Sequence, residues 1–205
     1  MSVSALLLAL SIAVPGDSSL DALFASGVPF DRFLAAADDR KAAWERTWEN
    51  SRVPDEVLAV ARALPGRWRL LIIAVDGCSD SVNTVPYLAR LAVLAPQIEV
   101  RIIAPDAGRA LQEAHRTPDG RAATPTVIIL DAAGREVGAW VERPSALQNA
   151  GMEARTAGTF ERFLNGKQAW YDRDAGASTL REVVDLLAVA ATARTRPLPS
   201  PPGHR

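Results

Sequence analysis

The sequence predicts an α/β fold in which a β-α-β-α-β-β core carries extra helices at both ends. Residues 70–75 form a continuous apolar run bounded by glycines, which is typical of a strand buried on both faces. Two further runs rich in β-branched residues, 98–104 and 126–131, follow with helical patterns between them. A short turn after the third run leads into a fourth at 136–141, which indicates a closing hairpin.

The N-terminal segment, residues 1–16, contains an apolar run at 5–14 that is too short to span a bilayer. Its length suits the hydrophobic region of a signal peptide, but the residues before it include no Lys or Arg. We therefore favour an apolar extension of a cytoplasmic protein, with export as the alternative. The main domain is expected over 17–193.

Three helices are predicted before the first strand. One begins near residues 17–19, a second covers 30–50, and a third runs from Pro54 to the Pro65-Gly66 break. Trp44 and Trp48 share one face of the second helix, and their spacing favours packing on a core over a ligand platform.

The core elements follow in the order strand, helix, strand, helix, strand, strand. The first two strands are expected to be parallel, joined by a right-handed crossover. Their predicted ranges are 67–75, 78–95, 98–104, 106–116, 126–131 and 136–141.

The C-terminal third predicts further helices at roughly 145–155, 157–170 and 178–193. Residues 194–205 are rich in Pro and Arg and hold too few apolar side chains to pack, so we expect a disordered tail.

Composition excludes several classes of function. The chain of 205 residues has 23 Lys and Arg against 24 Asp and Glu, so no dominant basic field exists to bind nucleic acid. A single cysteine, Cys78, rules out an intrachain disulfide and a zinc site with several Cys ligands from one chain. His115 and His204 are too few for a His-rich metal centre. We expect no cofactor, no metal, and neither nucleic acid nor membrane as a partner.

Cys78 stands where a buried strand gives way to a helix, outside the carboxyl end of the strand, where sites form in open α/β sheets. The unpaired N–H groups and the dipole of the helix N-terminus favour a thiolate there. Asp80 opposes this, because a second negative charge disfavours the thiolate. Ser81 lies one helical turn on, where its hydroxyl is expected to hydrogen-bond the sulfur.

A second candidate element is Thr124-Pro125, directly before the third strand. A proline at this position is a candidate for a cis peptide bond, or else an ordinary trans proline that starts an edge strand. In the functional interpretation this loop faces Cys78, and Thr124 offers its backbone to an extended substrate.

These elements carry a resemblance to the thioredoxin-like superfamily. The stretch 76–88, DGCSDSVNTVPYL, is similar to the active-site segment of bacterial thioredoxin family proteins, which reads roughly Asp-Trp-Cys-Gly-Asp-(Ala/Ser) before a helix with Asn-x-x-Pro-x-Leu. The stretch 120–131 resembles their cis-proline segment, and 134–140 resembles their closing hairpin. The resemblance covers roughly residues 20–190.

The resemblance implies that Cys78 is the nucleophile and Pro125 the adjacent cis-proline, with Gly77 and Thr124 contacting substrate. The sequence departs from the family pattern at several positions. Ser81 replaces the resolving cysteine, Gly77 replaces an aromatic residue, and Ser79 replaces a glycine. The buried acid of dithiol thioredoxins is absent near Ile72. Arg121 remains a candidate for stabilising a thiolate or binding an anionic thiol.

Two functions follow from these residues. The first is a single-thiol (C-x-x-S) redox protein that forms mixed disulfides through Cys78 with a disulfide-bearing protein and is regenerated by a low-molecular-weight thiol. The alternative is a redox-inactive module that binds a peptide or protein in the same groove. An iron–sulfur carrier is a weaker third option, because it needs ligands from outside the chain. Whether the protein is an enzyme stays open.

Overall fold

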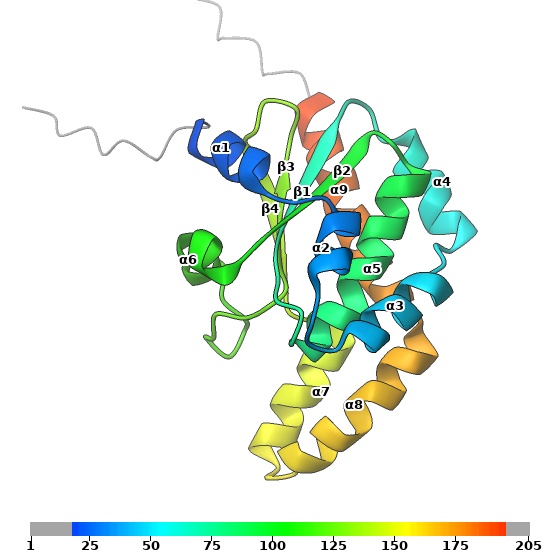
Figure 1. The fold of residues 1–205 in the computed structure, drawn as a ribbon, viewed down its shortest axis with the longest axis vertical. Helices are drawn as coiled ribbons and strands as arrows, with labels where there is room; N and C mark the ends of the chain where they lie inside the picture. Colours follow the sequence, from blue (N-terminus) through cyan, green and yellow to red (C-terminus); the bar gives the residue numbers. More distant parts are fainter. Residues whose placement is uncertain (1–17, 196–205) are drawn as a thin grey trace, which may run out of the picture.

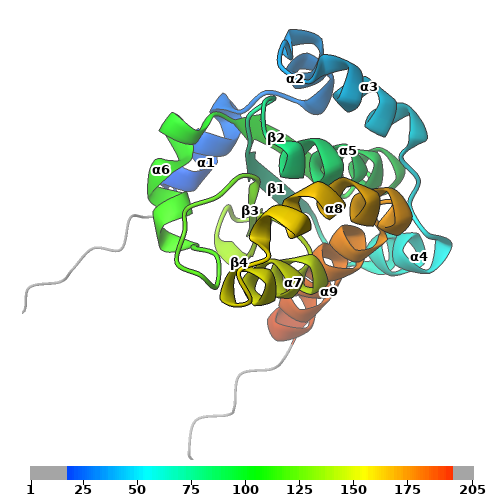
Figure 2. The same ribbon diagram turned by 90° about the horizontal axis from the view of Figure 1, so that it is seen from below.

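The computed structural model describes residues 18–195 and shows a four-stranded sheet with helices on both faces (Figures 1 and 2). This confirms the α/β fold class and the predicted order of the core strands and helices. The predicted N-terminal segment 1–16 lies outside the described residues, and so does the predicted tail apart from its first two residues. The strands are β1 (Trp68–Ile73), β2 (Ile98–Ile103), β3 (Thr126–Leu130) and β4 (Glu136–Val141). The helices are α1 (Ser18–Ser26), α2 (Phe30–Ala36), α3 (Lys41–Asn50), α4 (Asp55–Ala63), α5 (Ser79–Leu94), α6 (Pro105–Ala114), α7 (Ser145–Thr156), α8 (Phe160–Asp174) and α9 (Ala177–Thr195).

The strands lie in the order β2-β1-β3-β4. β1 and β2 are parallel, as expected for a crossover through α5, whereas β3 pairs antiparallel with both β1 and β4. The register places Ile73 beside both Ile103 and Thr126, and Thr126 beside Val141. The ends of β1, β2 and β4 and the start of β3 therefore meet at one edge of the sheet.

The fully apolar strands are explained by two cores, one on each face of the sheet. Successive side chains of a strand point to opposite faces, so an unbroken apolar run feeds both. Leu70, Ile72, Val127 and Ile129 belong to the larger core, with α5 and α9. The intervening side chains Leu71, Ile73, Ile128 and Leu130 belong to a smaller core with Phe24 of α1.

The prediction of one helix over 30–50 is wrong, because the chain breaks at residues 37–40 into α2 and α3. Ala37 is extended, and Arg40 has a positive φ of 54°. The Lys41 ammonium group donates to the carbonyl oxygens of Leu34 and Ala35 at 3.3 and 3.1 Å, at the C-terminal end of α2. The aromatic periodicity continues across this break, which is why the sequence pattern did not show it.

The C-terminal helices divide into two groups. α9 packs against α4, α5 and β4. The indole N–H of Trp140 in β4 donates to Glu182 of α9 at 2.7 Å. α7 and α8 form a helical hairpin at the lower end of the molecule in Figure 1. This hairpin lies beside the start of α5, so it borders the edge where Cys78 lies.

The β3–β4 turn is held by the buried carboxylate of Asp131. The backbone N–H groups of Ala133 and Arg135 donate to its Oδ1 at 2.8 and 3.1 Å, and the Arg135 guanidinium donates to its Oδ2 at 2.7 and 3.0 Å. Burial raises the pKa of Asp131, but the hydrogen bonds from Arg135 and Ala133 outweigh it and leave the pKa below its usual value. The ionised carboxylate therefore stabilises the fold.

Asp131→Asn is expected to lower the free energy of unfolding at neutral pH. A carboxyl whose pKa is lower in the folded than in the unfolded chain contributes stability above its unfolded pKa of about 3.9 and loses it as the pH falls. The gap between parent and variant should therefore close below about pH 4. Urea unfolding between pH 7 and pH 3 measures it.

Asp106→Asn is the matched control, because this carboxylate pairs with Arg109 but is 92% exposed. Its effect should be small at every pH. A constant gap between Asp131→Asn and the parent across the whole pH range would contradict the role of the ionised carboxylate.

Candidate functional site

Cys78 is the N-cap residue of α5 and is partly exposed. Its carbonyl accepts the first bond of the helix, from the N–H of Val82 at 3.0 Å. Its thiol donates to the carbonyl oxygen of Thr124 at 3.3 Å, and the Thr124–Pro125 peptide bond is cis. The fold thus brings together two segments that the sequence separates by 46 residues.

The loop before Cys78 is held by the α2–α3 connection. The backbone N–H groups of Asp38 and Asp39 donate to Asp76 Oδ2 at 2.9 and 3.0 Å. The Asp38 bond is the leading cause of an Asp76 pKa below its usual value. The indole N–H of the fully buried Trp44 donates to the Asp76 carbonyl at 2.8 Å. Trp44 is therefore a core residue that also positions this loop.

Gly77 fills a narrow space beside that connection. Its carbonyl accepts the Arg40 Nε–H at 2.7 Å, so this oxygen already has a donor. A Cβ at position 77 would lie 3.1 Å from Asp39 Oδ2, a tight approach. A side chain at this position would therefore require the exposed Asp39 carboxylate to shift.

Ser81 does not make the expected hydrogen bond to the sulfur. Its side chain is completely buried, and its hydroxyl has no partner among residues 18–195. The Cys78 thiol instead turns toward Thr124. The helical spacing placed Ser81 on the correct turn, but the thiol points at the Pro125 loop.

Asp80 lies in a buried cluster of charges rather than as an isolated negative charge beside Cys78. The Tyr171 hydroxyl donates to its Oδ1 at 2.7 Å. Lys167 Nζ and Arg143 Nη2 donate to its Oδ2 at 2.8 and 3.2 Å. Two cations therefore offset the charge that was expected to oppose a thiolate. Burial, followed by the Asp80 charge, raises the pKa of Tyr171 and keeps the phenol protonated.

Lys167 also reaches the residue that follows the cysteine. Its ammonium donates to Ser79 Oγ at 2.9 Å, and its side chain is only 12% exposed. α8 thus brings a positive charge to the first turn of α5. This charge adds to the favourable field of the helix N-terminus at Cys78.

Arg121 is engaged by carboxylates, which differs from the expectation that it serves the sulfur. Its guanidinium donates to both carboxylate oxygens of Glu142 at 2.9 and 3.1 Å and to Asp119 at 2.8 Å. The hydrogen bond from Arg121 lowers the pKa of Asp119 to about 2. The Glu142 hydrogen bonds are the leading cause of a raised Arg121 pKa.

Glu142 connects this group to the cysteine side of the site. Its backbone N–H donates to the Pro125 carbonyl at 2.7 Å, with a positive φ of 67°. Its carboxylate also accepts a hydrogen bond from Arg143, which reaches Asp80. A continuous chain of charged groups therefore runs from the Pro125 loop to the first turn of α5.

Sequence reasoning missed four residues of this network, Glu142, Arg143, Lys167 and Tyr171. A charged pair directly after the last strand was a signal for the first two, because β4 ends at the edge where Cys78 lies. The other two come from α8, 87 and 91 residues away from Asp80 along the chain. No local pattern indicates such long-range contacts.

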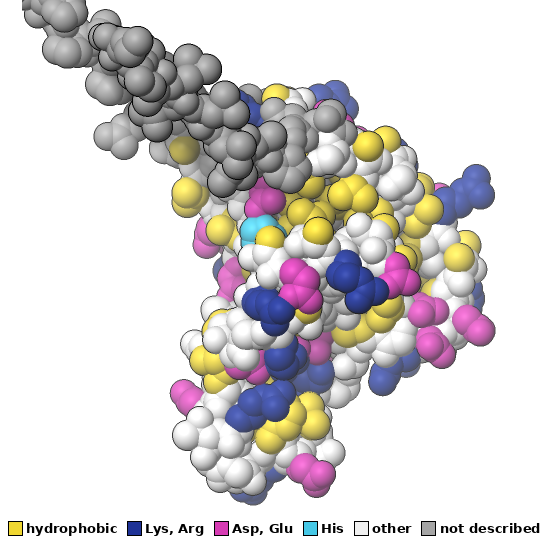
Figure 3. Space-filling model, turned by 90° about the vertical axis from the view of Figure 1, so that its left-hand side faces the viewer, with side chains coloured by type: hydrophobic (Ala, Val, Ile, Leu, Met, Phe, Trp, Pro, Cys, Tyr) yellow, Lys and Arg dark blue, Asp and Glu magenta, His cyan; other side chains and the backbone are white. Residues whose placement is uncertain are grey.

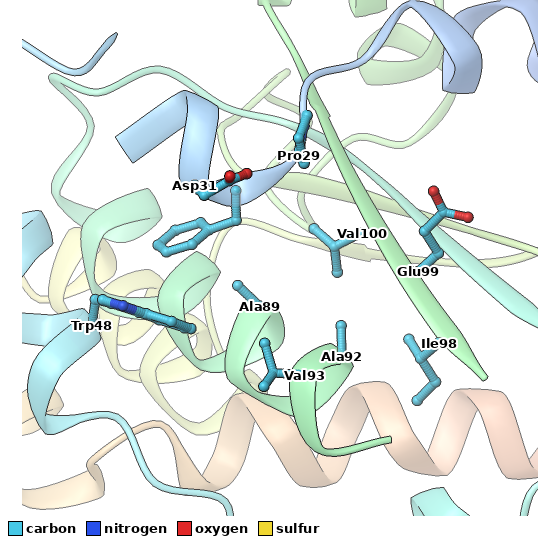
Figure 4. Close-up of a pocket in the computed structure, with 10 residues that line it drawn as sticks. Pro29, Asp31, Trp48, Ala89, Ala92, Val93, Ile98, Glu99 and Val100 are labelled. Atoms are coloured by element: carbon cyan, nitrogen blue, oxygen red, sulfur yellow. The ribbon is translucent and has the colours of Figure 1, made fainter. Parts of the chain in front are cut away.

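An apolar cleft of about 330 Å³ lies elsewhere, between α2, α5, β2 and Trp48 (Figure 4). Ala89, Ala92 and Val93 of α5 line it, with the carboxylates of Asp31 and Glu99 as its acidic groups. It contains no nucleophile and lies apart from Cys78, so it does not belong to the candidate site.

The described surface carries charged side chains of both signs. On the face in Figure 3, acidic and basic side chains are mixed. Between residues 18 and 195, no helix is both long and apolar enough to cross a bilayer. No group of three or more His, Cys, Asp or Glu in the same range is arranged to hold a metal ion.

Comparisons with known proteins agree with this geometry. A family model described as Thioredoxin matches residues 27–156. The crystal structure of a protein of unknown function from Pseudomonas aeruginosa is similar with a TM-score of 0.64 and 25% identity, over 82% of this chain and 96% of that one. An HIV epitope scaffold is similar with a TM-score of 0.64 and 24% identity, over 82% of this chain and 97% of that one. A search of curated proteins found no match.

Proposed function

Because this chain belongs to the thioredoxin family, we propose that it is a single-thiol disulfide-exchange protein whose reacting atom is Cys78 Sγ. The observation that carries the proposal is the position of Cys78 at the N-terminus of α5, where the Lys167 ammonium group donates to the adjacent Ser79 and to Asp80. The thiol is partly exposed and faces the loop along which an extended substrate would pair.

The proposed reaction has two exchange steps. In the first, the Cys78 thiolate attacks one sulfur of a substrate disulfide, a mixed disulfide forms, and the other substrate sulfur leaves as a thiolate. In the second, an external low-molecular-weight thiolate attacks the substrate sulfur of the mixed disulfide and releases Cys78 as a thiolate. One substrate sulfur is released as a thiolate, and the other ends in a new disulfide with the external thiol, so the net reaction is an exchange of disulfides.

Ser81 explains why the second step needs an external thiol. A hydroxyl cannot resolve a mixed disulfide, and the chain has no second cysteine. The proposal places the protein in the cytoplasm, where reduced low-molecular-weight thiols are maintained.

Lys167→Met is expected to slow alkylation of Cys78 by iodoacetamide several-fold at neutral pH. The variant keeps most of the side-chain length but removes the cation that offsets Asp80, so the first turn of α5 becomes more negative and disfavours the thiolate. The half-maximal point of the pH profile of alkylation should move to higher pH.

Arg162→Gln is the matched control, since Arg162 is exposed on the same helix. It should leave the alkylation profile of the parent protein in place. An unchanged profile in Lys167→Met would show that Lys167 has only a structural role.

The proposal is tested by following Cys78 with intact-protein mass spectrometry at pH 7 during incubation with bis(2-hydroxyethyl) disulfide. One adduct should form faster on the folded protein than on the urea-unfolded chain, and added glutathione should remove it. Slower modification of the folded protein would refute the proposal, because the fold would then protect the thiol rather than activate it.

A second candidate function is a redox-inactive module that binds an extended peptide between Cys78 and Pro125. The hydrogen bond from the thiol to Thr124 favours it, because donation to a carbonyl stabilises the protonated form. A peptide partner retained equally by the parent protein and by Cys78→Ser would support this function. If a reductant releases the retained peptide, the result supports disulfide exchange through Cys78 instead.

A further inference from the structure

A polar cavity of about 250 Å³ lies between α3, α5 and α8. α3 packs against α5, and α8 reaches the first turns of α5 (Figures 1 and 2). Its polar lining includes Arg46 and Asn50 of α3, Asn83 and Tyr87 of α5, and Gln168 and Asp172 of α8. None of these six residues was a candidate from the sequence, since they come from three separate segments.

The cavity carries one charge of each sign on different helices. Arg46 and Asp172 are both exposed, and no ion pair joins them. Within residues 18–195, Arg46 forms no salt bridge at all, and Asp172 accepts a hydrogen bond from Gln168 at 2.9 Å. Each charge therefore remains available to a ligand that spans the cavity.

The wall between these charges is polar, and the amide N–H groups of Asn83 and Gln168 are used within the protein, on each other and on Ser79 and Asp172. The wall therefore offers a ligand the amide oxygens and the Tyr87 hydroxyl. Asn83, only 8% exposed, exchanges two hydrogen bonds of 3.1 Å with Gln168. Burial raises the pKa of Tyr87, with smaller contributions from the charges of Asp174 and Asp172, so its phenol stays protonated. Such a wall suits a polar, amide-bearing ligand better than an apolar one.

We propose that this cavity binds a small zwitterion, an amino acid or a dipeptide, with its carboxylate at Arg46 and its ammonium group at Asp172. A volume of about 250 Å³ holds several water molecules and is sufficient for a ligand of amino-acid or dipeptide size. A simple anion would meet the Asp172 charge, and a simple cation would meet the Arg46 charge. A zwitterion pairs with both.

The site touches the first turns of α5 without including the thiol. Asn83 Nδ2 donates to the Ser79 carbonyl at 2.7 Å, and Tyr171, which also lines the cavity, donates to Asp80. Binding needs no sulfur chemistry, so it is measured on Cys78→Ser protein. If Cys78 does not exchange disulfides, ligand binding in the cavity can still be tested. If the cavity binds no ligand, disulfide exchange can still be tested.

The experiment is a ¹H–¹⁵N NMR titration of Cys78→Ser protein with glycylglycine. The side-chain amide signals of Asn83 and Gln168 should shift with a saturable, millimolar or tighter Kd. N-acetylglycylglycine, which lacks the ammonium group, and glycylglycinamide, which lacks the carboxylate, should each bind about tenfold more weakly.

Two variants assign the charges of the ligand to the two walls. The Asp172→Asn variant should bind glycylglycine and N-acetylglycylglycine with equal affinity. The Arg46→Gln variant should bind glycylglycine and glycylglycinamide with equal affinity. Glu49→Gln and Arg173→Gln remove exposed charges from the same helices outside the cavity and should leave the Kd unchanged.

Three results would overturn the inference. The first is that the Asn83 and Gln168 signals do not shift at about 10 mM glycylglycine. The second is equal affinity for the peptide and its two analogues. The third is an equal loss of affinity in the cavity variants and the control variants.

Discussion

Cys78→Ser is expected to abolish disulfide exchange, with turnover of bis(2-hydroxyethyl) disulfide by glutathione falling to the rate without protein. The chain has one sulfur nucleophile, and a serine hydroxyl does not attack disulfides at neutral pH. The substitution leaves the N-cap position suited to a helix start, because serine is a preferred N-cap residue. Stability should therefore stay the same or rise, and a coupled thiol-oxidation assay measures the loss of turnover.

A relocated thiol is the control for this prediction. Ser26 is exposed at the end of α1, so Ser26→Cys combined with Cys78→Ser keeps one thiol per chain but removes it from the site. The combined variant should be alkylated readily yet give no acceleration. Acceleration equal to that of the parent would mean that any exposed thiol suffices and that the site contributes nothing.

Asp80→Ala is expected to lower the free energy of unfolding by about 3–5 kcal/mol, the cost of breaking a buried ion pair from one side. Asp80 is 5% exposed and accepts from Tyr171, Lys167 and Arg143. Its loss leaves two cations and a phenol without their common acceptor. Urea unfolding at pH 7 measures the change.

The combined variant Asp80→Ala with Lys167→Met isolates the interaction between the two charged side chains. Removing both partners should cost less than the sum of the single changes, with a coupling of about 0.5–3 kcal/mol for groups in contact. Asp106→Asn, an exposed carboxylate, should change stability by less than about 0.5 kcal/mol. Additive effects of the single changes would show that Asp80 and Lys167 do not interact.

Most of the fold follows from local signals. The apolar run at 70–75, the two further β-rich runs and the hairpin at 132–134 predicted every strand of the described sheet and the parallel pairing of β1 with β2. The break between α2 and α3 could not be predicted, because the carboxylate that accepts its backbone N–H groups belongs to Asp76, which lies 37–38 residues further on. The periodicity of apolar residues carries no information about a hydrogen-bond acceptor so far away in the sequence.

The candidate site was predictable to a similar extent. The positions of Cys78 and Pro125 follow from where strands end, and the structure brings the two segments together. The hydrogen-bond partners did not follow, because helical spacing placed the Ser81 hydroxyl near the sulfur and Arg121 was only a candidate to reach it. In the structure, Arg121 donates hydrogen bonds to Glu142 and Asp119, and side chains from α8 donate to Asp80.

The hydrogen bonds from α8 to the first turn of α5 have a consequence for synthesis of the chain. The 87 residues that follow Asp80, up to and including Lys167, take roughly 4–17 s to translate at 5–20 residues per second. During that interval the cysteine segment has been made, but its cationic counterpart does not yet exist. The thiol of a nascent chain is therefore expected to react with disulfides more slowly than the thiol of the finished molecule.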